Sequence, residues 1–544
     1  MINNLGESFL FLSFLMGIVG TIAFYFASKK KSNILVLVGE RSIKAVFSLL
    51  SLSVLLLVYL LVTKDYSNAY VAKNASNDLS IIYSIAALWA GQEGSLLLWS
   101  WILSMFAFIV TISKTFKPLI VSTEKTVLFI LSFFVFLIVV IENPFEVLSS
   151  APKNGRGLNP ILQNFYMAIH PLTLYVGYIA LSIPFGFAIG SILSKDKTDS
   201  WIILSKRWTY FSWVFLSIGL LLGSRWAYLE LGWGGYWAWD PVENVALMPW
   251  LALTAFVHSS MAQESRSLLR KWNICLIFIA FFLSIFGTFI TRSGLISSVH
   301  SFAQSSIGPY FIVFILLLVG FSIFIYQRNK RFICSNQEIV SLFSKENFFI
   351  FNNIFFLVIT LTVLLGTIFP ILSEAITGEK ILVGPSFYNL VNFPNILLLM
   401  SLMSVAPIIP WKEGRVLPIL KFIFIPFIIS FLLTLASLFY FYNIKVLLVF
   451  FLSFFIVSII LKELIEDFKL QLKKQTNITE IFRLKLRRYC SFLIHFGIIL
   501  AIIGITLSST YGTKSDFILS KSEKIDINQY EVQLINTYRK EIES

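Results

Sequence analysis

Long runs of apolar residues recur along the whole chain, and they constrain its fold more than any other feature. Hydrophobic residues make up 57% of the 544 residues, whereas charged residues make up only 13%. A run of about 18 or more apolar residues is long enough for a helix to cross a bilayer. The sequence therefore predicts an all-α, polytopic membrane domain over residues 1–508, followed by an external segment over residues 509–544. Roughly fourteen such runs are present, near residues 5–27, 42–62, 93–112, 119–141, 165–193, 208–223, 243–261, 273–291, 308–326, 349–371, 394–411, 417–441, 445–461 and 489–508.

Positive charge is distributed unevenly among the loops that join these runs. About 29 Lys and Arg residues lie in alternate loops, and about 8 lie in the loops between them. Because cytoplasmic loops are enriched in cations, this pattern predicts that both termini lie outside the cytoplasm. Topology and contact with membrane lipid thus account for the net charge of +14, and no nucleic-acid partner is expected. The basic loops are 29–44, 114–125, 195–207, 266–271, 328–345, 412–415 and 462–488.

One predicted outer loop, WGGYWAWDP, concentrates aromatic residues. Trp233, Trp237 and Trp239 lie within seven residues of one another, together with a tyrosine and two glycines. Flat rings beside glycines, which have no Cβ, suit a flat apolar ligand that lies close to the backbone. The alternative is an aromatic belt at the membrane interface, which needs neither glycines nor such clustering. Arg225 and Arg292 flank the outer region, where each would pair with a propionate carboxylate or with lipid headgroups.

Only four histidines are present, and the predicted topology sorts them into two pairs. His170 and His300 lie on the outer side, and His258 and His495 lie near the cytoplasmic ends of two different runs. Neutral imidazole is the commonest axial ligand of haem iron, and a histidine at membrane depth is a functional candidate. Each pair could therefore ligate one haem. The alternatives are interhelical hydrogen bonds for the inner pair, and a helix start and an ordinary loop position for the outer pair.

The tryptophan-rich loop also contains a helix-start signal. Asp240 stands at the N-cap position, Pro241 at the first helical position and Glu243 at the third. The loop therefore caps the apolar run that carries His258. Eighteen residues separate Asp240 from His258, which corresponds to roughly 27 Å along a helix. One helix is expected to join the outer aromatic loop to an inner histidine.

The three cysteines, Cys275, Cys334 and Cys490, all fall on the predicted cytoplasmic side. The chain contains neither a CxxC nor a CxxCH motif. It therefore offers no thiol on the predicted outer side for disulfide exchange or for covalent attachment of haem.

The tryptophan-rich loop, within a segment of about 224–250, resembles the WWD signature of haem-handling proteins in cytochrome c maturation. Further segments are similar to segments of one branch of these proteins, the CcmF family, and the histidine in the run 489–508 matches as well. The resemblance covers residues from about 40 to 510, and it is specific because several independent motifs occur in register. The segments, in the family's order, are GQEGSLLLW (91–99), NGRGLNPILQ (154–163), HPLTLYVGY (170–178) and TRSGLISSVHSFA (291–303).

The resemblance implies a haem lyase component of cytochrome c-type biogenesis. It assigns His170 and His300 as ligands of incoming haem beside the tryptophan-rich loop and Asp240, and it assigns His258 and His495 as axial ligands of a resident transmembrane haem b. Members of the family receive haem from the chaperone CcmE and apocytochrome c from CcmH or CcmI. They promote thioether bonds between haem vinyls and the cysteines of a CxxCH motif.

The resemblance also implies a location in the bacterial inner membrane, with the haem-loading face toward the periplasm. Electrons relayed from quinol through the resident haem would keep the incoming haem reduced. Family members usually continue with a larger periplasmic segment and a last transmembrane helix, so a shortened form or a fragment is expected here.

Two other classes of protein stay open on the sequence alone. A transporter of haem or of a small molecule suits the number of helices, but Glu142, Glu230 and Glu243 lie near helix ends rather than centrally. A membrane electron-transfer subunit would hold structural haem and have no role in ligation.

Overall fold

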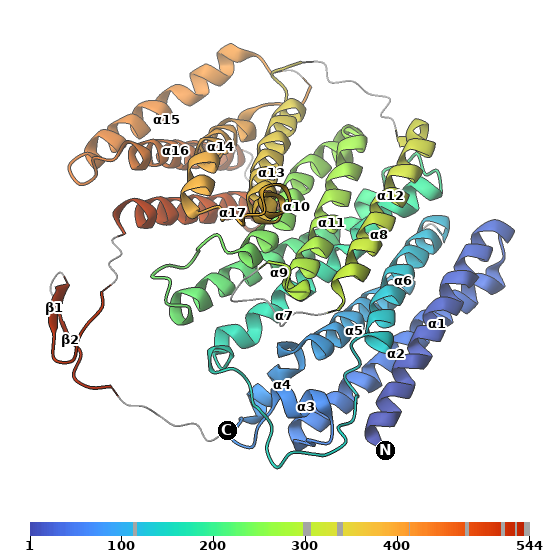
Figure 1. The fold of residues 1–544 in the computed structure, drawn as a ribbon. Coiled ribbons are helices and arrows are strands. Elements are labelled where there is room, and N and C mark those ends of the chain that lie inside the picture. The colour runs from blue at the N-terminus through green and yellow to red at the C-terminus, as the bar shows by residue number, and fades with distance from the viewer. Residues whose placement is uncertain are drawn as a thin grey trace. The chain divides into compact units, whose positions relative to one another are not determined.

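The described residues form long helices and a short β-hairpin (Figure 1). The computed structural model describes residues 1–112, 117–296, 306–333, 341–412, 414–473, 478–512, 517–527 and 530–537. The helices are α1 (Ile2–Lys30), α2 (Asn33–Thr63), α3 (Ala69–Asn74), α4 (Ile81–Ala90), α5 (Gln92–Thr111), α6 (Lys117–Val140), α7 (Phe165–Ala180), α8 (Ser182–Leu193), α9 (Ser200–Glu230), α10 (Pro241–Arg266), α11 (Arg270–Ser293), α12 (Gly308–Ile333), α13 (Lys345–Thr377), α14 (Pro385–Val405), α15 (Val416–Ser437), α16 (Ile444–Lys473) and α17 (Ile478–Tyr511). The strands are β1 (Lys524–Ile527) and β2 (Tyr530–Gln533), which pair antiparallel.

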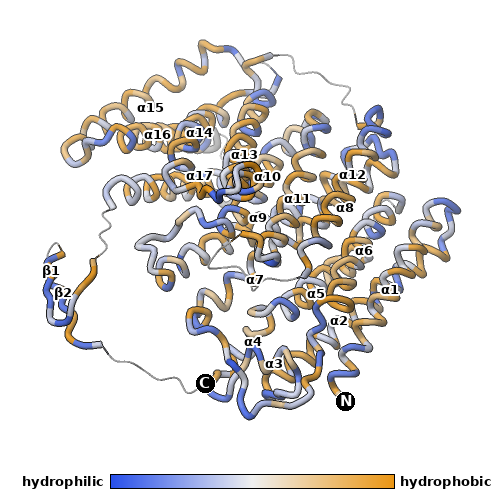
Figure 2. The backbone as a smooth tube through the Cα atoms, in the orientation of Figure 1, coloured by the Kyte–Doolittle hydropathy of each residue, from blue (hydrophilic) through white to orange (hydrophobic). Residues whose placement is uncertain are grey.

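The predicted apolar runs form helices. Among the described residues, 13 helices are long and apolar enough to cross a membrane. Figure 2 shows hydrophobic residues along the lengths of these helices and hydrophilic residues at many of their ends. The remaining predicted run, 208–223, lies within α9, a 31-residue helix that is not one of the 13. Its tryptophans, tyrosines and serines lower its mean hydropathy, because these side chains carry polar atoms.

One predicted run, 165–193, is divided into α7 and α8. The backbone leaves the regular helix at Leu181, where the amide donates to the carbonyl oxygen of Tyr178 at 3.2 Å. Proline lacks an N–H and disrupts regular helix bonding, and Pro171 and Pro184 lie on either side of the break. The two helices together still make one membrane-spanning length.

The chain comprises two compact units, Met1–Ile425 and Pro426–Ser544. The first unit holds the extended hydrophobic core, in which α10 packs against α9, α11 and α13, and α7 packs against α9. The second unit contains most of α15, the helices α16 and α17, and the β-hairpin. The predicted boundary near residue 508 stays a prediction.

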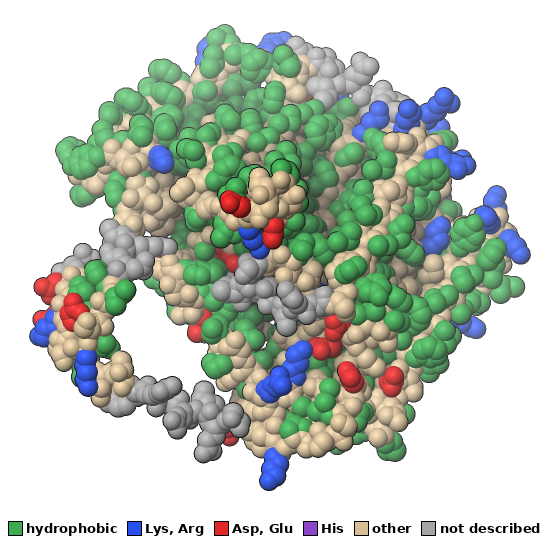
Figure 3. All heavy atoms as spheres, viewed as in Figure 1, with side chains coloured by type: hydrophobic (Ala, Val, Ile, Leu, Met, Phe, Trp, Pro, Cys, Tyr) green, Lys and Arg blue, Asp and Glu red, His purple; other side chains and the backbone are tan. Residues whose placement is uncertain are grey.

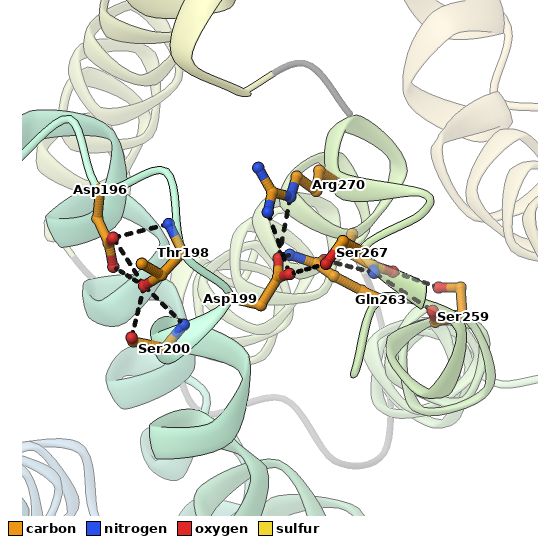
Figure 4. Close-up of polar contacts among 9 residues, drawn as sticks. Asp196, Thr198, Asp199, Ser200, Ser259, Gln263, Ser267 and Arg270 are labelled. Carbon is orange, nitrogen blue, oxygen red and sulfur yellow. Dashed lines mark hydrogen bonds and ion pairs between the residues drawn. The ribbon is translucent and has the colours of Figure 1, made fainter. Parts of the chain in front are cut away.

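Several predicted inner loops meet at one end of the first unit. Arg270 Nε and Nη2 donate to the two carboxylate oxygens of Asp199 at 3.0 and 3.1 Å. Gln263 Nε2 and Ser267 Oγ also donate to Asp199, as Figure 4 shows. Hydrogen bonds and an ion pair at Asp199 therefore connect the loop 195–207 to the turn between α10 and α11. Figure 3 shows Lys and Arg side chains gathered over the ends of α1 and α12, which adjoin two further predicted inner loops.

Candidate functional site

His170 lies in the second turn of α7, where this helix packs closely against α9. A Cβ atom at Gly219 would lie 2.5 Å from Cδ2 of Leu174, and one at Gly223 would lie 2.5 Å from Cε1 of His170. The two glycines are four residues apart, the small-xxx-small spacing that lets membrane helices approach each other closely. The glycine pair thus places the imidazole directly against the backbone of α9.

Contacts with α9 also set the tautomer and the orientation of the His170 ring. Nδ1 lies 2.8 Å from the carbonyl oxygen of Gly219. Because a carbonyl only accepts, Nδ1 carries the proton and Nε2 carries the lone pair. The ring stacks near Trp226, with centroids 6.5 Å apart and an interplanar angle of 14°, and Trp226 is 1% exposed. Histidines that bind metals commonly donate their other N–H to a carbonyl in this way, so His170 fits the ligation of haem iron.

The tryptophan-rich loop follows α9 and has an unusual backbone. Gly232 and Gly234 both have φ of 63°, a left-handed conformation that glycine adopts without steric cost. Trp239 has φ of 58° as well. For a bulky residue this conformation costs about 1–3 kcal/mol, and it persists only where surrounding contacts determine it. The backbone strain in the loop therefore lies at Trp239, immediately before α10.

The predicted helix start at Asp240 is confirmed. The side chain of Asp240 accepts from the backbone N–H of Val242 at 2.9 Å. Glu243 Oε2 accepts from the backbone N–H groups of Asp240 and Ala238, each at 3.0 Å. This capping box satisfies the N–H groups that the first turn of α10 cannot bond internally. Asp240 thus has a complete structural role.

The first turn of α14 holds Trp239 in place, which the sequence did not indicate. The rings of Trp239 and Tyr388 are stacked, with centroids 4.7 Å apart and an interplanar angle of 9°. The indole N–H of Trp239 donates to Asn389 Oδ1 at 3.0 Å. Asn244 Nδ2 donates to the carbonyl oxygen of Trp239 at 3.1 Å and to the hydroxyl of Tyr388 at 3.3 Å. No local pattern signals a partner about 150 residues away in the chain.

The same helix that begins at the loop carries His258 at its other end. α10 runs without interruption from Pro241 to Arg266, so the predicted connection between loop and histidine is confirmed. Nδ1 of His258 lies 2.8 Å from the carbonyl oxygen of Thr254, which again leaves the lone pair on Nε2. Phe349 and Phe356 of α13 lie beside the imidazole, each with a centroid distance of 6.3 Å. An imidazole held this way among aromatic rings fits an axial haem ligand.

The proposed partner of His258 lies in the second compact unit, and that of His170 lies outside the described residues. His495 is half-buried on α17, in the second compact unit. His300 lies outside the described residues. The pairing of His170 with His300, and that of His258 with His495, therefore stay predictions.

The two arginines have different surroundings. Arg225 is exposed on α9, with its guanidinium 6.0 Å from the ring centroid of Tyr166 and 5.7 Å from that of Tyr228. Arg292, at the end of α11, is 1% exposed and donates to Ser95 Oγ at 2.6 Å. The exposed guanidinium of Arg225, beside the first turn of α7, suits the binding of a carboxylate. The hydrogen bond of Arg292 instead connects α11 to α5.

The segment 91–99 builds the outer end of the bundle. A Cβ atom at Gly94 would lie 2.5 Å from the hydroxyl oxygen of Tyr70, and one at Gly91 would lie 2.6 Å from Cε2 of the same ring. The hydroxyl of Tyr70 donates to the carbonyl oxygen of Ala87 at 2.6 Å. Burial raises the pKa of Tyr70 well above its usual value, and the negative charge of Glu93 adds to the effect. The hydroxyl therefore stays protonated and anchors α3 against the end of α4.

The segment 154–163 packs against α3. A Cβ atom at Gly155 would lie 2.1 Å from the carbonyl oxygen of Ala75, so only glycine fits there. Asn154 Oδ1 accepts from the backbone N–H of Asn77 at 2.8 Å. This segment thus supports the outer end of the bundle.

Among the described residues, no group of three or more His, Cys, Asp or Glu side chains is placed to hold a metal ion. Cys275 and Cys490 are exposed free thiols, and Cys334 lies outside the described residues.

Comparison with known proteins gives one consistent family. Residues 89–300 match the family model described as "Cytochrome C assembly protein". The chain is 35% identical over 499 residues to the cytochrome c-type biogenesis protein CcmF of Pseudomonas aeruginosa, which covers 89% of this chain and 74% of that protein. It is 34% identical to CcmF of Escherichia coli, over 88% of this chain and 73% of that protein. A solved structure of a cytochrome c heme lyase, CcmF, superposes with a TM-score of 0.81 at 26% identity, and the match covers 97% of this chain and 81% of that one.

Proposed function

Because the chain belongs to the CcmF family of cytochrome c-type biogenesis proteins, we propose that it attaches haem to apocytochrome c at the outer face of the membrane. Its general role is that of a multi-pass haem lyase component of cytochrome c biogenesis. The observation that carries the finer proposal is the position of His170. Its Nε2 lone pair is fixed by a bond from Nδ1 to the carbonyl oxygen of Gly219 on α9, the helix that leads into the tryptophan-rich loop.

At the outer site, His170 and His300 bind the iron of the incoming haem. Trp233 and Trp237 offer rings against the porphyrin, and Arg225 binds a propionate. Each cysteine thiol of a CxxCH motif adds across one haem vinyl. The S–H bond breaks, a C–S bond forms at the inner vinyl carbon and the hydrogen goes to the terminal carbon, so no electrons are gained or lost. The protein contributes mainly proximity and orientation, which bring the vinyls against the thiols.

At the inner site, His258 and His495 hold a resident haem b. When bound, this haem supplies one-electron transfer, which keeps the substrate haem reduced with quinol as the electron source. α10 fixes the distance between His258 and the outer loop, because it is one helix from Pro241 to Arg266. Phe349 and Phe356 provide an apolar surface beside the imidazole of His258.

The setting follows from the same proposal. The protein resides in the bacterial inner membrane, with the tryptophan-rich loop toward the periplasm. The chaperone CcmE delivers haem, and CcmH- or CcmI-type proteins deliver apocytochrome c. The thiols belong to the apocytochrome, which agrees with the predicted location of this chain's cysteines.

Absorption spectra of the purified protein test the inner site. We expect a b-type haem signal in the wild type and its loss in both His258→Ala and His495→Ala. Cys490→Ala serves as the control, since it changes an exposed residue on the same helix as His495. Retention of the full signal in both histidine variants would contradict the inner site.

Formation of holo-cytochrome c in cells tests the outer site. We expect His170→Ala and His300→Ala to abolish covalent haem attachment while the resident b-type signal remains. If either variant forms normal amounts of holo-cytochrome c, or also loses the resident b-type signal, the substituted histidine does not have the proposed role.

A further inference from the structure

The first turn of α14 contacts Trp239 of the tryptophan-rich loop. Its ring lies parallel to that of Tyr388, its indole N–H donates to Asn389 Oδ1, and its carbonyl oxygen accepts from Asn244. We propose that Tyr388 and Asn389 are positioning residues of the outer haem site, which fix the Trp239 indole and thereby the conformation of the whole loop. This inference rests on the proposed function.

The backbone of Trp239 explains why the loop needs such a support. Its φ of 58° is a left-handed conformation that bulky residues rarely adopt. The indole contacts with Tyr388 and Asn389 hold the side chain from outside the loop, and Asn244 holds the carbonyl from α10. Together they determine both the ring and the peptide of one residue, which is the condition under which a strained conformation persists.

Tyr388 is itself buried against a neighbouring helix. Tyr388 is 2% exposed, and its ring sits on α13 at Gly366, where a Cβ atom would lie 2.6 Å from Cε1 of the tyrosine. α13 in turn packs along α10 and carries Phe349 and Phe356 beside His258. The loop is therefore oriented by the same helices that surround the inner histidine (Figure 1).

The contacts also divide the tryptophans by role. One face of the Trp239 ring is covered by Tyr388, and Trp237 meets Trp239 edge to face, with centroids 5.9 Å apart and an interplanar angle of 89°. Trp239 thus orients Trp237, and of these two rings Trp237 is the one left to face haem. Tyr388 and Asn389 lie beyond residues 89–300, the segment that matches the family model. The loop within that segment is consequently completed by a later part of the chain.

The test uses the full chain in lipid nanodiscs. Hydrogen exchange of a peptide covering residues 232–240 is measured without added haem, and ferric haem is then titrated while absorbance is recorded. Asn389→Leu removes the acceptor at an exposed position where the fold does not depend on it, and Asn389→Asp keeps an acceptor oxygen. Asn395→Leu is the matched control, because its amide bonds only the carbonyl of Val391 on its own helix.

In Asn389→Leu we expect about fivefold faster exchange of the loop and about fivefold weaker binding of added haem. Asn389→Asp and Asn395→Leu should stay within about twofold of the wild type. In a Trp239→Phe background, which lacks the indole donor, Asn389→Leu should have no further effect.

Wild-type exchange in Asn389→Leu, or an undiminished effect of Asn389→Leu in the Trp239→Phe background, would overturn the positioning role. A failure of the proposed function gives a different result. In that case the wild type shows no binding of added haem that depends on His170, whereas the exchange of the loop still responds to Asn389→Leu.

Discussion

The two ends of α10 are held by different chemistry. At the outer end the contacts are neutral or local: a capping box, a ring stacked on Tyr388 and an indole bonded to Asn389. At the inner end, charged side chains tie α10 to two other helices. Arg266 bonds Glu346 of α13 at 3.2 Å, and Glu264 pairs with Lys206 of α9.

This difference matches the two proposed tasks. A resident group needs an environment that does not change, and ion pairs with a buried carboxylate such as Glu346, 2% exposed, fix the helix end firmly. A site that receives and releases a substrate needs a loop whose contacts can reform. Neutral hydrogen bonds and stacked rings, each of modest strength, meet that need.

The largest effect is expected from Arg266→Ala at the inner end. The change leaves the carboxylate of Glu346 buried without its cation, although the backbone N–H of Lys412 still donates to it. We expect a loss of stability of about 3 kcal/mol, seen as a lower midpoint of thermal unfolding in detergent. Lys73→Ala is the control, since Lys73 pairs with Glu93 at 52% exposure. Equal shifts in the two variants would remove the distinction between the two ends.

Gly223→Ala should disrupt the outer site. The new Cβ atom would lie 2.5 Å from Cε1 of His170 and would displace the ring. A displacement on the order of 1 Å can lower a rate by about 100-fold, so we expect that loss in holo-cytochrome c formation with the inner haem retained. Gly320→Ala on α12 has open space around it and should leave formation unchanged. Matching results for the two glycines would contradict the close packing of α7 on α9.

Substitution of Asp240 separates capping from catalysis. Asp240→Ala should cost about 1 kcal/mol of stability through loss of the N-cap. Asp240→Asn keeps an oxygen for the backbone N–H of Val242 and should retain both stability and holo-cytochrome c formation. If Asp240→Asn were stable and yet inactive, the carboxylate would have a chemical role beyond the cap.

The smallest effect is expected from Lys206→Met. Both partners of the Lys206 and Glu264 pair are partly exposed, so solvent screens their attraction. We expect a loss of about 0.5 kcal/mol, measured by the same unfolding experiment. A loss as large as that of Arg266→Ala would show that burial does not set the strength of the inner contacts.

The sequence predicted features that depend on local pattern. The apolar runs predicted the positions of the helices, because length and hydropathy decide which segments can cross a membrane. The capping box at Asp240 was predictable because all of its atoms come from residues 238–243. The continuity of α10 followed in the same way.

The features that were missed depend on contacts between distant segments. Tyr388 and Asn389 precede the predicted apolar run 394–411, and only the packing of α14 brings them to Trp239. The inward position of Arg292 likewise depends on Ser95, which lies on another helix. The break between α7 and α8 was missed because the run 165–193 is apolar throughout, so hydropathy does not reveal the interrupted helix bonding at Leu181.

The contact between α7 and α9 restricts how these two helices can vary. Leu174 faces Gly219 and His170 faces Gly223, so each pair shares one fixed volume. A larger residue at 219 can be accommodated in part by a smaller side chain at 174, because the Leu174 side chain contributes only packing, although the carbonyl of residue 219 must still bond His170. No such exchange is open at 223, because the proposed haem ligation requires that the residue opposite remain an imidazole. We therefore expect related sequences to show paired substitutions at positions 174 and 219, and no substitution at positions 170 and 223.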